Sequence, residues 1–152
     1  MKLLAKCFAF LVCCGLVLPA CGAATCSVLS ASITFGSYGP LTHATADETA
    51  LGSILVSCTG PTTGTISLAV GTGSFSARTM PSGGNTLYYN LYIDAGYTEI
   101  WGDGTSGTLT VPFTFSSSGS QNFPVYGKIP HGQSSAAVGT YNATPQVTIT
   151  WP

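Results

Sequence analysis

Apolar and polar residues alternate in seven short runs along the chain. Alternation with a period of two residues predicts β-strands that bury one face and expose the other. Clusters of Gly, Ser and Pro at 81–84, 102–107 and 116–120 are typical of turns between antiparallel strands. The pattern therefore predicts an all-β sandwich. The apolar positions of the seven runs are Leu29, Ala31, Ile33 and Phe35; Ile54, Val56 and Cys58; Ile66, Leu68 and Val70; Leu87, Tyr89, Leu91 and Ile93; Leu109, Val111, Phe113 and Phe115; Phe123 and Val125; and Val147, Ile149 and Trp151.

The last run has an unusual character for a strand at the edge of a sheet. Val147, Ile149 and Trp151 share one face, and no charged residue lies among them. Edge strands of this kind pair readily with other chains, and proteins usually protect them with charge, proline or a bulge. The run is therefore predicted either to lie inside a sheet of this chain or to pair with a strand from another polypeptide.

Residues 1–24 are predicted to be a secretory signal peptide. Lys2 and Lys6 precede an apolar run at 8–20 that is too short to cross a bilayer as a helix, and small residues follow it. Cleavage is expected near Ala23 or Ala24, which leaves one folded domain at 25–152. Two alternatives stay open: lipidation of Cys21 within a lipobox, and an uncleaved membrane anchor.

Loss of the signal leaves two cysteines, Cys26 and Cys58. An even pair in an exported chain predicts a disulfide, because the compartment outside the inner membrane is oxidising. A loop of this length would be stabilised by about 3–4 kcal/mol in the chain-entropy model.

The remaining polar residues argue against several classes of function. Only Arg78 and Lys128 are basic in 25–152, so nucleic acid is an unexpected partner. His43 and His131 are expected in exposed loops without the spacing of metal ligands, and Asp47-Glu48 is expected to be a solvated loop. The 102–104 segment is interpreted as a tight turn. With no catalytic motif in the domain, we expect no enzyme activity, no metal and no cofactor.

Three tyrosines are candidates for a role beyond the core. Tyr88, Tyr92 and Tyr97 fall out of phase with the apolar face, which predicts either a patch that binds a surface or sugar, or ordinary cross-strand packing. Trp101 is expected to plug one end of the sandwich.

Five segments of the chain carry a resemblance to a known family: 33-ITFGSYGPL-41, 51-LGSILVSCTG-60, 75-FSARTMPSGGNTLYYNLYIDAGYTEIWGDGTSGT-108, 125-VYGKIPHGQSSAAVGTY-141 and 146-QVTITW-151. Together they resemble the spore coat protein U family, which includes subunits of archaic chaperone-usher pili. The resemblance implies an immunoglobulin-like sandwich that lacks its last strand. In such subunits a periplasmic chaperone first fills the resulting groove, and the N-terminal extension of a neighbouring subunit fills it after export through an outer-membrane usher.

The resemblance and the exposed last run predict the same groove. We expect an adhesive, biofilm-forming pilus subunit that passes through the periplasm to the cell surface. Few residues separate the predicted cleavage site from Cys26, so the chain is expected to accept a strand but not to donate one, as a tip subunit would. The alternatives are a spore or cyst coat protein that forms a surface layer, and a secreted or lipid-anchored carbohydrate-binding module. The predicted groove residues are Leu29, Ala31, Ile33, Phe35, Val147, Ile149 and Trp151.

Overall fold

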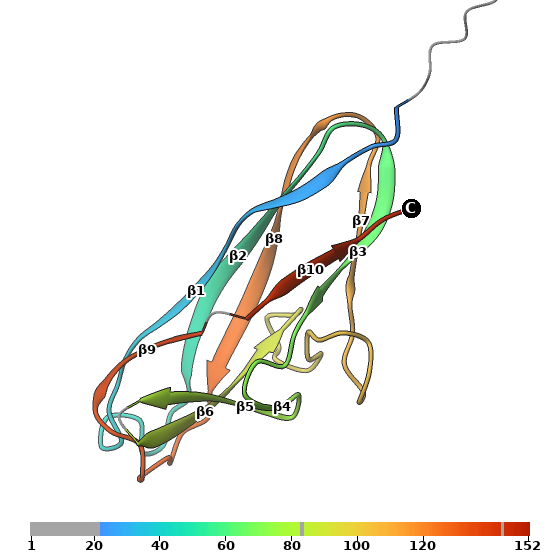
Figure 1. Ribbon diagram of the computed structural model, residues 1–152. Helices are drawn as coiled ribbons and strands as arrows, with labels where there is room; N and C mark the ends of the chain where they lie inside the picture. The colour runs from blue at the N-terminus through green and yellow to red at the C-terminus, as the bar shows by residue number, and fades with distance from the viewer. Residues whose placement is uncertain (1–21, 83, 144) are drawn as a thin grey trace, which may run out of the picture.

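The computed structural model describes residues 22–82, 84–143 and 145–152, and these residues form ten β-strands (Figure 1). The predicted signal peptide lies mostly outside this part of the chain. Within the described ranges no helix is long and apolar enough to cross a membrane. The strands are β1 (Cys26–Tyr38), β2 (Glu48–Cys58), β3 (Thr62–Leu68), β4 (Gly73–Ser74), β5 (Ala77–Ser82), β6 (Asn85–Tyr92), β7 (Val111–Phe115), β8 (Gly119–Ile129), β9 (Gly139–Ala143) and β10 (Val147–Thr150).

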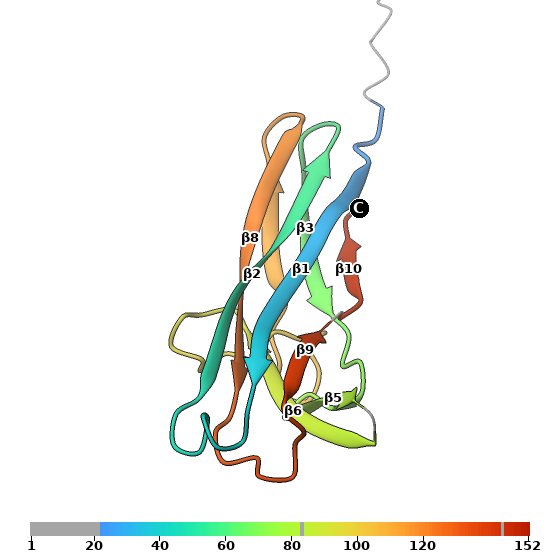
Figure 2. The ribbon, with the colours of Figure 1, turned by 90° about the vertical axis from the view of Figure 1, so that its left-hand side faces the viewer.

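The strands form two antiparallel sheets. The larger sheet has the order β4-β5-β6-β8-β2-β1-β9, and the smaller has the order β10-β3-β7. A short turn between β2 and β3 carries the chain from one sheet to the other, and the β9–β10 connection does so again (Figure 2). The predicted all-β sandwich with antiparallel strands is thus confirmed.

Alternating side chains from both sheets fill the space between them. Val56 and Ile66 are fully buried, as the period-two pattern requires. Trp101 is also fully buried, and its indole Nε1 donates a hydrogen bond to the carbonyl oxygen of Ile66 at 3.1 Å. This partner allows the polar indole N–H to be buried, so the expected burial of Trp101 is confirmed.

The predicted disulfide joins the first residue of β1 to the last residue of β2. Cys26 lies directly opposite Cys58 in the ladder, and the two are bonded. The register then shifts between Val28 and Ser30, so that Leu29 is the extra residue of a bulge in β1. The bulge moves the inward-facing positions of β1 from even to odd residue numbers.

Four apolar residues of the predicted runs lie outside the strands, one of them Trp151, which follows the last residue of β10. Val70, Ile93 and Leu109 follow or precede strands that end earlier than the alternation suggested. Leu109 is 45 % exposed and makes only an isolated parallel bridge with Trp101.

Candidate functional site

The feature with the clearest functional meaning is a gap between two strand edges. β9 pairs with β1 only from Ile33 to Tyr38, so residues 26–32 of β1 have a partner on one side alone in the described part of the chain. β10 pairs with β3 and with no other described strand. These two edges face one another across the open side of the sandwich, as Figure 2 shows. We call this feature the β1–β10 gap.

An apolar pocket opens within the β1–β10 gap and leads toward the core. Its rim includes Ala31 of β1 and Val147 of β10. Behind the rim lie Ile54, Leu68 and Val125, which belong to three strands of the two sheets and are at most 3 % exposed. The pocket is therefore lined mainly by apolar side chains, with buried core residues at its base.

The backbone of β10 is oriented for further pairing. Ala69 N donates to Gln146 O at 2.9 Å, so these two residues form a hydrogen-bonded pair next to the β3–β10 ladder. Counting by twos from Gln146, Thr148 and Thr150 are the residues of β10 that bond to β3. In an antiparallel ladder every second residue directs its N–H and C=O to the neighbouring strand. Val147 and Ile149 consequently direct their backbone groups away from β3, toward the gap.

The other sheet edges are short or blocked. β4 has two residues and β9 has five, and β7 carries Pro112, which removes a backbone donor from its strand. β10 contains no proline and no charged residue. β10 is also short, with four residues, but it lacks the proline that blocks β7.

The structure places five of the seven predicted groove residues along the gap. Ala31, Ile33 and Val147 line its apolar pocket, and Ile149 is half-buried against the core. Trp151 is also half-buried and closes one end of the gap, because its indole Nε1 donates to the carbonyl oxygen of Ala24 at 2.9 Å.

The other two predicted residues occupy different surroundings. Phe35 lies in the part of β1 that β9 covers; it is buried and meets the Tyr89 ring edge-on. Leu29 sits on the bulge and is 57 % exposed. Sequence reasoning missed Val28, which packs half-buried against the core. Cys26 and Cys58 are paired by the disulfide, and the period-two alternation continued from them predicts that Val28 and Val56 face inward as well.

The three candidate tyrosines do not form one patch. Tyr92 and Tyr97 meet edge-to-face with ring centroids 5.6 Å apart, and the Lys128 ammonium lies 5.7 and 5.4 Å from the two centroids. Tyr88 is half exposed, and its backbone N–H and C=O are bound by the side-chain amide of Gln133, at 2.7 and 2.9 Å. Burial raises the pKa of Tyr92, as packing between neighbours predicts.

Both histidines pair with acidic residues, which corrects two expectations. His43 stacks on Tyr38 and its Nε2 lies 2.8 Å from Glu48, with only 13 % of its side chain exposed. The prediction of an exposed His43 is therefore wrong. Glu48 is likewise not part of a solvated loop, because it is the first residue of β2 and is half-buried, whereas Asp47 lies in an exposed loop as expected.

The second pair joins two loops at one end of the sandwich. His131 donates from its backbone N–H to Asp47 Oδ1 at 3.0 Å, its ring Nδ1 lies 2.6 Å from the same oxygen, and Lys128 lies 3.7 Å from Oδ2. The backbone hydrogen bond, followed by the side-chain one, lowers the pKa of Asp47 below its usual value. His131 itself remains half exposed, as expected.

A buried arginine was not anticipated. Arg78 is fully buried; Nη1 donates to Asn90 Oδ1 at 2.7 Å, and Nη2 donates to the carbonyl oxygens of Trp101 and Ala69 at 2.8 and 3.3 Å. Its charge lies 5.2 Å from the Phe75 ring centroid, and burial lowers its pKa. These hydrogen bonds connect β5 to β6 and to the loops that contain Ala69 and Trp101, so Arg78 has a structural role.

In the described residues, no three His, Cys, Asp or Glu side chains come together to hold a metal ion.

Comparison with protein families matches residues 15–148 to the Spore Coat Protein U domain. No curated protein matches the chain.

Proposed function

Because the chain belongs to the Spore Coat Protein U domain family, whose domains are structural parts of surface pili or coats, we propose that it is a pilus subunit assembled by strand addition. The β1–β10 gap is the proposed acceptor for a β-strand from another polypeptide. The observation that carries this proposal is the apolar pocket in the gap, since buried core residues Ile54, Leu68 and Val125 lie at its base and a strand edge without proline or charge lies beside it.

The geometry of the gap defines how a strand would enter. β1 and β10 run in opposite directions (Figure 2), so an inserted strand is parallel to one and antiparallel to the other. Its backbone would bond to the free groups of Val147 and Ile149. Its alternate side chains would point inward, onto the pocket between Ala31 and Val147.

Strand addition would contribute a large share of the stability. Burial of four or five apolar side chains at about 1.5–3 kcal/mol each gives roughly 10 kcal/mol before the costs of binding. That is comparable to the whole folding free energy of a typical domain. A free subunit would therefore be marginally stable, and it would need a chaperone that fills the gap.

The proposed partners follow from this need. A periplasmic chaperone would supply the first strand, an outer-membrane usher would pass the subunit outward, and a neighbouring subunit would supply the final strand. We further propose export through the periplasm to the cell surface, where the fibre supports adhesion and biofilm formation.

The test is a comparison of melting temperatures with and without a donor strand. The exported chain is expressed alone and with a strand of alternating apolar residues fused after Pro152 through a flexible linker. We expect the fused strand to raise the melting temperature by about 10 °C or more, because several kcal/mol of burial are added. Circular dichroism measures the transition.

Two controls make the outcome specific. A fused strand with serine at its apolar positions should give no increase, and Val147→Asp in the acceptor should cancel the effect of the apolar strand. Equal melting temperatures for all versions would mean that the sandwich is already complete, and the proposal would be withdrawn.

The position of the subunit in the fibre is a separate prediction. The tip position expected from the sequence is tested by immunogold labelling of isolated pili. Label at one end supports the tip position, whereas regular label along the shaft contradicts it and leaves the acceptor role intact.

A further inference from the structure

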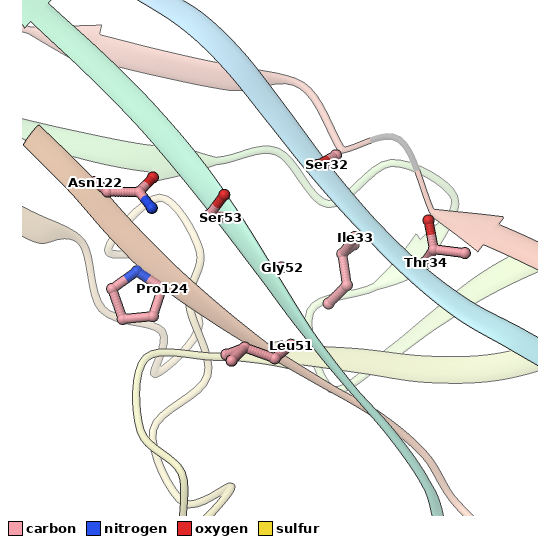
Figure 3. Close-up of a pocket in the computed structure, with 8 residues that line it drawn as sticks. All are labelled: Ser32, Ile33, Thr34, Leu51, Gly52, Ser53, Asn122 and Pro124. Atoms are coloured by element: carbon pink, nitrogen blue, oxygen red, sulfur yellow. The ribbon is translucent and has the colours of Figure 1, made fainter. Parts of the chain in front are cut away.

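A second surface lies on the larger sheet, next to the β1–β10 gap pocket, with which it shares Ser32 and Ile33. An open depression of about 420 Å³ crosses β1, β2 and β8, and Gly52 lies among the residues that line it (Figure 3). This volume is within the range of sites for small ligands. A Cβ at Gly52 would collide with the Ser32 carbonyl oxygen and with Ile33, so glycine allows β1 to pass close to β2 here.

The register of the sheet aligns the lining residues across three strands. Ser32 of β1 lies opposite Ser53 of β2, and Ser53 lies opposite Pro124 of β8. Asn122 and Leu51 flank this row, and Leu51 is 69 % exposed. A regular ladder thus holds these side chains, rather than a loose loop.

The polar groups of the depression are free to bind a ligand. Within the described chain, the side chains of Ser32, Thr34, Ser53 and Asn122 have no hydrogen-bond partner. By contrast, Ser57 on the same strand donates to Gly119 O at 3.1 Å. Hydroxyl and amide groups both donate and accept, so four of them together can match several hydroxyl groups.

The chemistry of the lining selects one class of ligand. No charged residue lines the depression, so it offers no partner for a carboxylate, phosphate or ammonium group. Leu51 and Pro124 offer apolar contact beside the polar groups, as Figure 3 shows. Tyr126 lies opposite Leu51 and Tyr92 lies opposite Tyr126 in the ladder, which extends the apolar border.

From these observations we propose that the β1–β2–β8 depression binds a neutral carbohydrate. The C–H face of a sugar ring would pack on Leu51 and Pro124, while its hydroxyl groups bond to Ser53 and Asn122. The four residues that would contact the sugar do not line the gap pocket, so the site would give the subunit an adhesive function in addition to its structural one.

The test uses the purified exported chain and an array of neutral mono-, di- and trisaccharides. The sugar with the strongest signal is then titrated calorimetrically against the parent chain and the variants Asn122→Ala and Leu51→Ala. We expect each variant to weaken binding about fivefold, the effect of one lost hydrogen bond or a comparable apolar contact. Thr63→Ala, on an exposed position of the smaller sheet, is the matched control and should bind as the parent does.

Each result decides the question. Absence of binding to every neutral sugar, equal binding by all variants, or preference for charged glycans or peptides would overturn the proposal. All three substitutions are at solvent-exposed positions, and unchanged melting curves would exclude misfolding. Val147→Asp separates the two functions, since it should block strand addition and leave sugar binding unchanged.

Discussion

Trp151 is the residue that links the two sides of the proposed acceptor. Its indole N–H binds the carbonyl oxygen of Ala24, two residues before β1, while its ring packs half-buried against the core. One side chain thus bridges β10 and the approach to β1 at one end of the gap. A strand that enters along the whole gap must displace this hydrogen bond.

Trp151→Phe is expected to accelerate strand entry. The substitution keeps an aromatic ring in the core and removes the N–H donor, so the bridge to Ala24 is lost. A neutral hydrogen bond contributes about 1 kcal/mol, which corresponds to about a fivefold increase in rate if the bond breaks before the slow step. Fluorescence anisotropy of a labelled donor peptide measures the rate. An unchanged rate would show that the bridge opens after the slow step or not at all.

Asp47 is expected to make part of the stability depend on acid pH. Its pKa is lowered in the folded state by the hydrogen bonds from His131, so its contribution is present above the unfolded-state pKa of about 3.9. That contribution is lost as the pH falls through the folded-state value. The side chain is one-third exposed, so the effect is small.

Asp47→Asn tests this dependence. The melting temperature of the variant should fall less between pH 6 and pH 3 than that of the parent, and the two proteins should differ most near neutral pH. Asp94→Asn is a useful comparison, because its carboxylate also accepts hydrogen bonds from Thr98 and Glu99 and has a lowered pKa. Parallel pH curves for Asp47→Asn and the parent would contradict the prediction.

At the scale of elements, the disulfide fixes the half of β1 that has a partner strand on one side only. Cys26 and Cys58 bond at the end of the β1–β2 ladder, next to the gap. The double variant Cys26→Ser/Cys58→Ser is expected to lose about 3–4 kcal/mol of unfolding free energy, because the unfolded chain regains the entropy of the loop. Urea unfolding measures this loss, with a reduced parent as control. A loss below 1 kcal/mol would mean that the ladder alone holds β1 in place.

Alternation alone was sufficient to locate seven of the ten strands. The three that it missed have physical reasons to be missed. β4 has two residues, and β5 buries Arg78 beside Met80, so an inward-facing charge interrupts the apolar pattern. β9 is five residues long and contributes only Tyr141 and Ala143 to the core.

Similar limits explain which residues of the site could be predicted from the sequence and which could not. The gap residues on β10 followed from simple alternation, but the bulge at Leu29 changed the phase of β1, and no local signal at that position predicts a bulge. The depression around Gly52 could not be anticipated at all. It depends on the register between β1, β2 and β8, which brings together residues some 90 positions apart in the sequence.

At the scale of the whole molecule, the charged residues are unevenly distributed. No Asp, Glu, Lys or Arg occurs in residues 49–77, 104–127 or 129–152, which include all of β3, β7 and β10 and most of β2 and β8. β1 also has none. Among the strands around the β1–β10 gap and the β1–β2–β8 depression, ionic side chains occur only at Glu48, the first residue of β2, and at Lys128, near the end of β8.

This distribution has a consequence for the environment in which a fibre could work. Dissolved ions weaken contacts between charges, with a screening length of about 10 Å at 0.1 M and about 3 Å at 1 M, but they do not weaken backbone pairing or apolar packing in the same way. Joints between subunits at the gap should hold equally well in fresh water and in brine. Pulling or dissociation measurements on isolated fibres at both ionic strengths would test whether the joints are equally strong. A joint that loosens in brine would point to an ionic contact elsewhere.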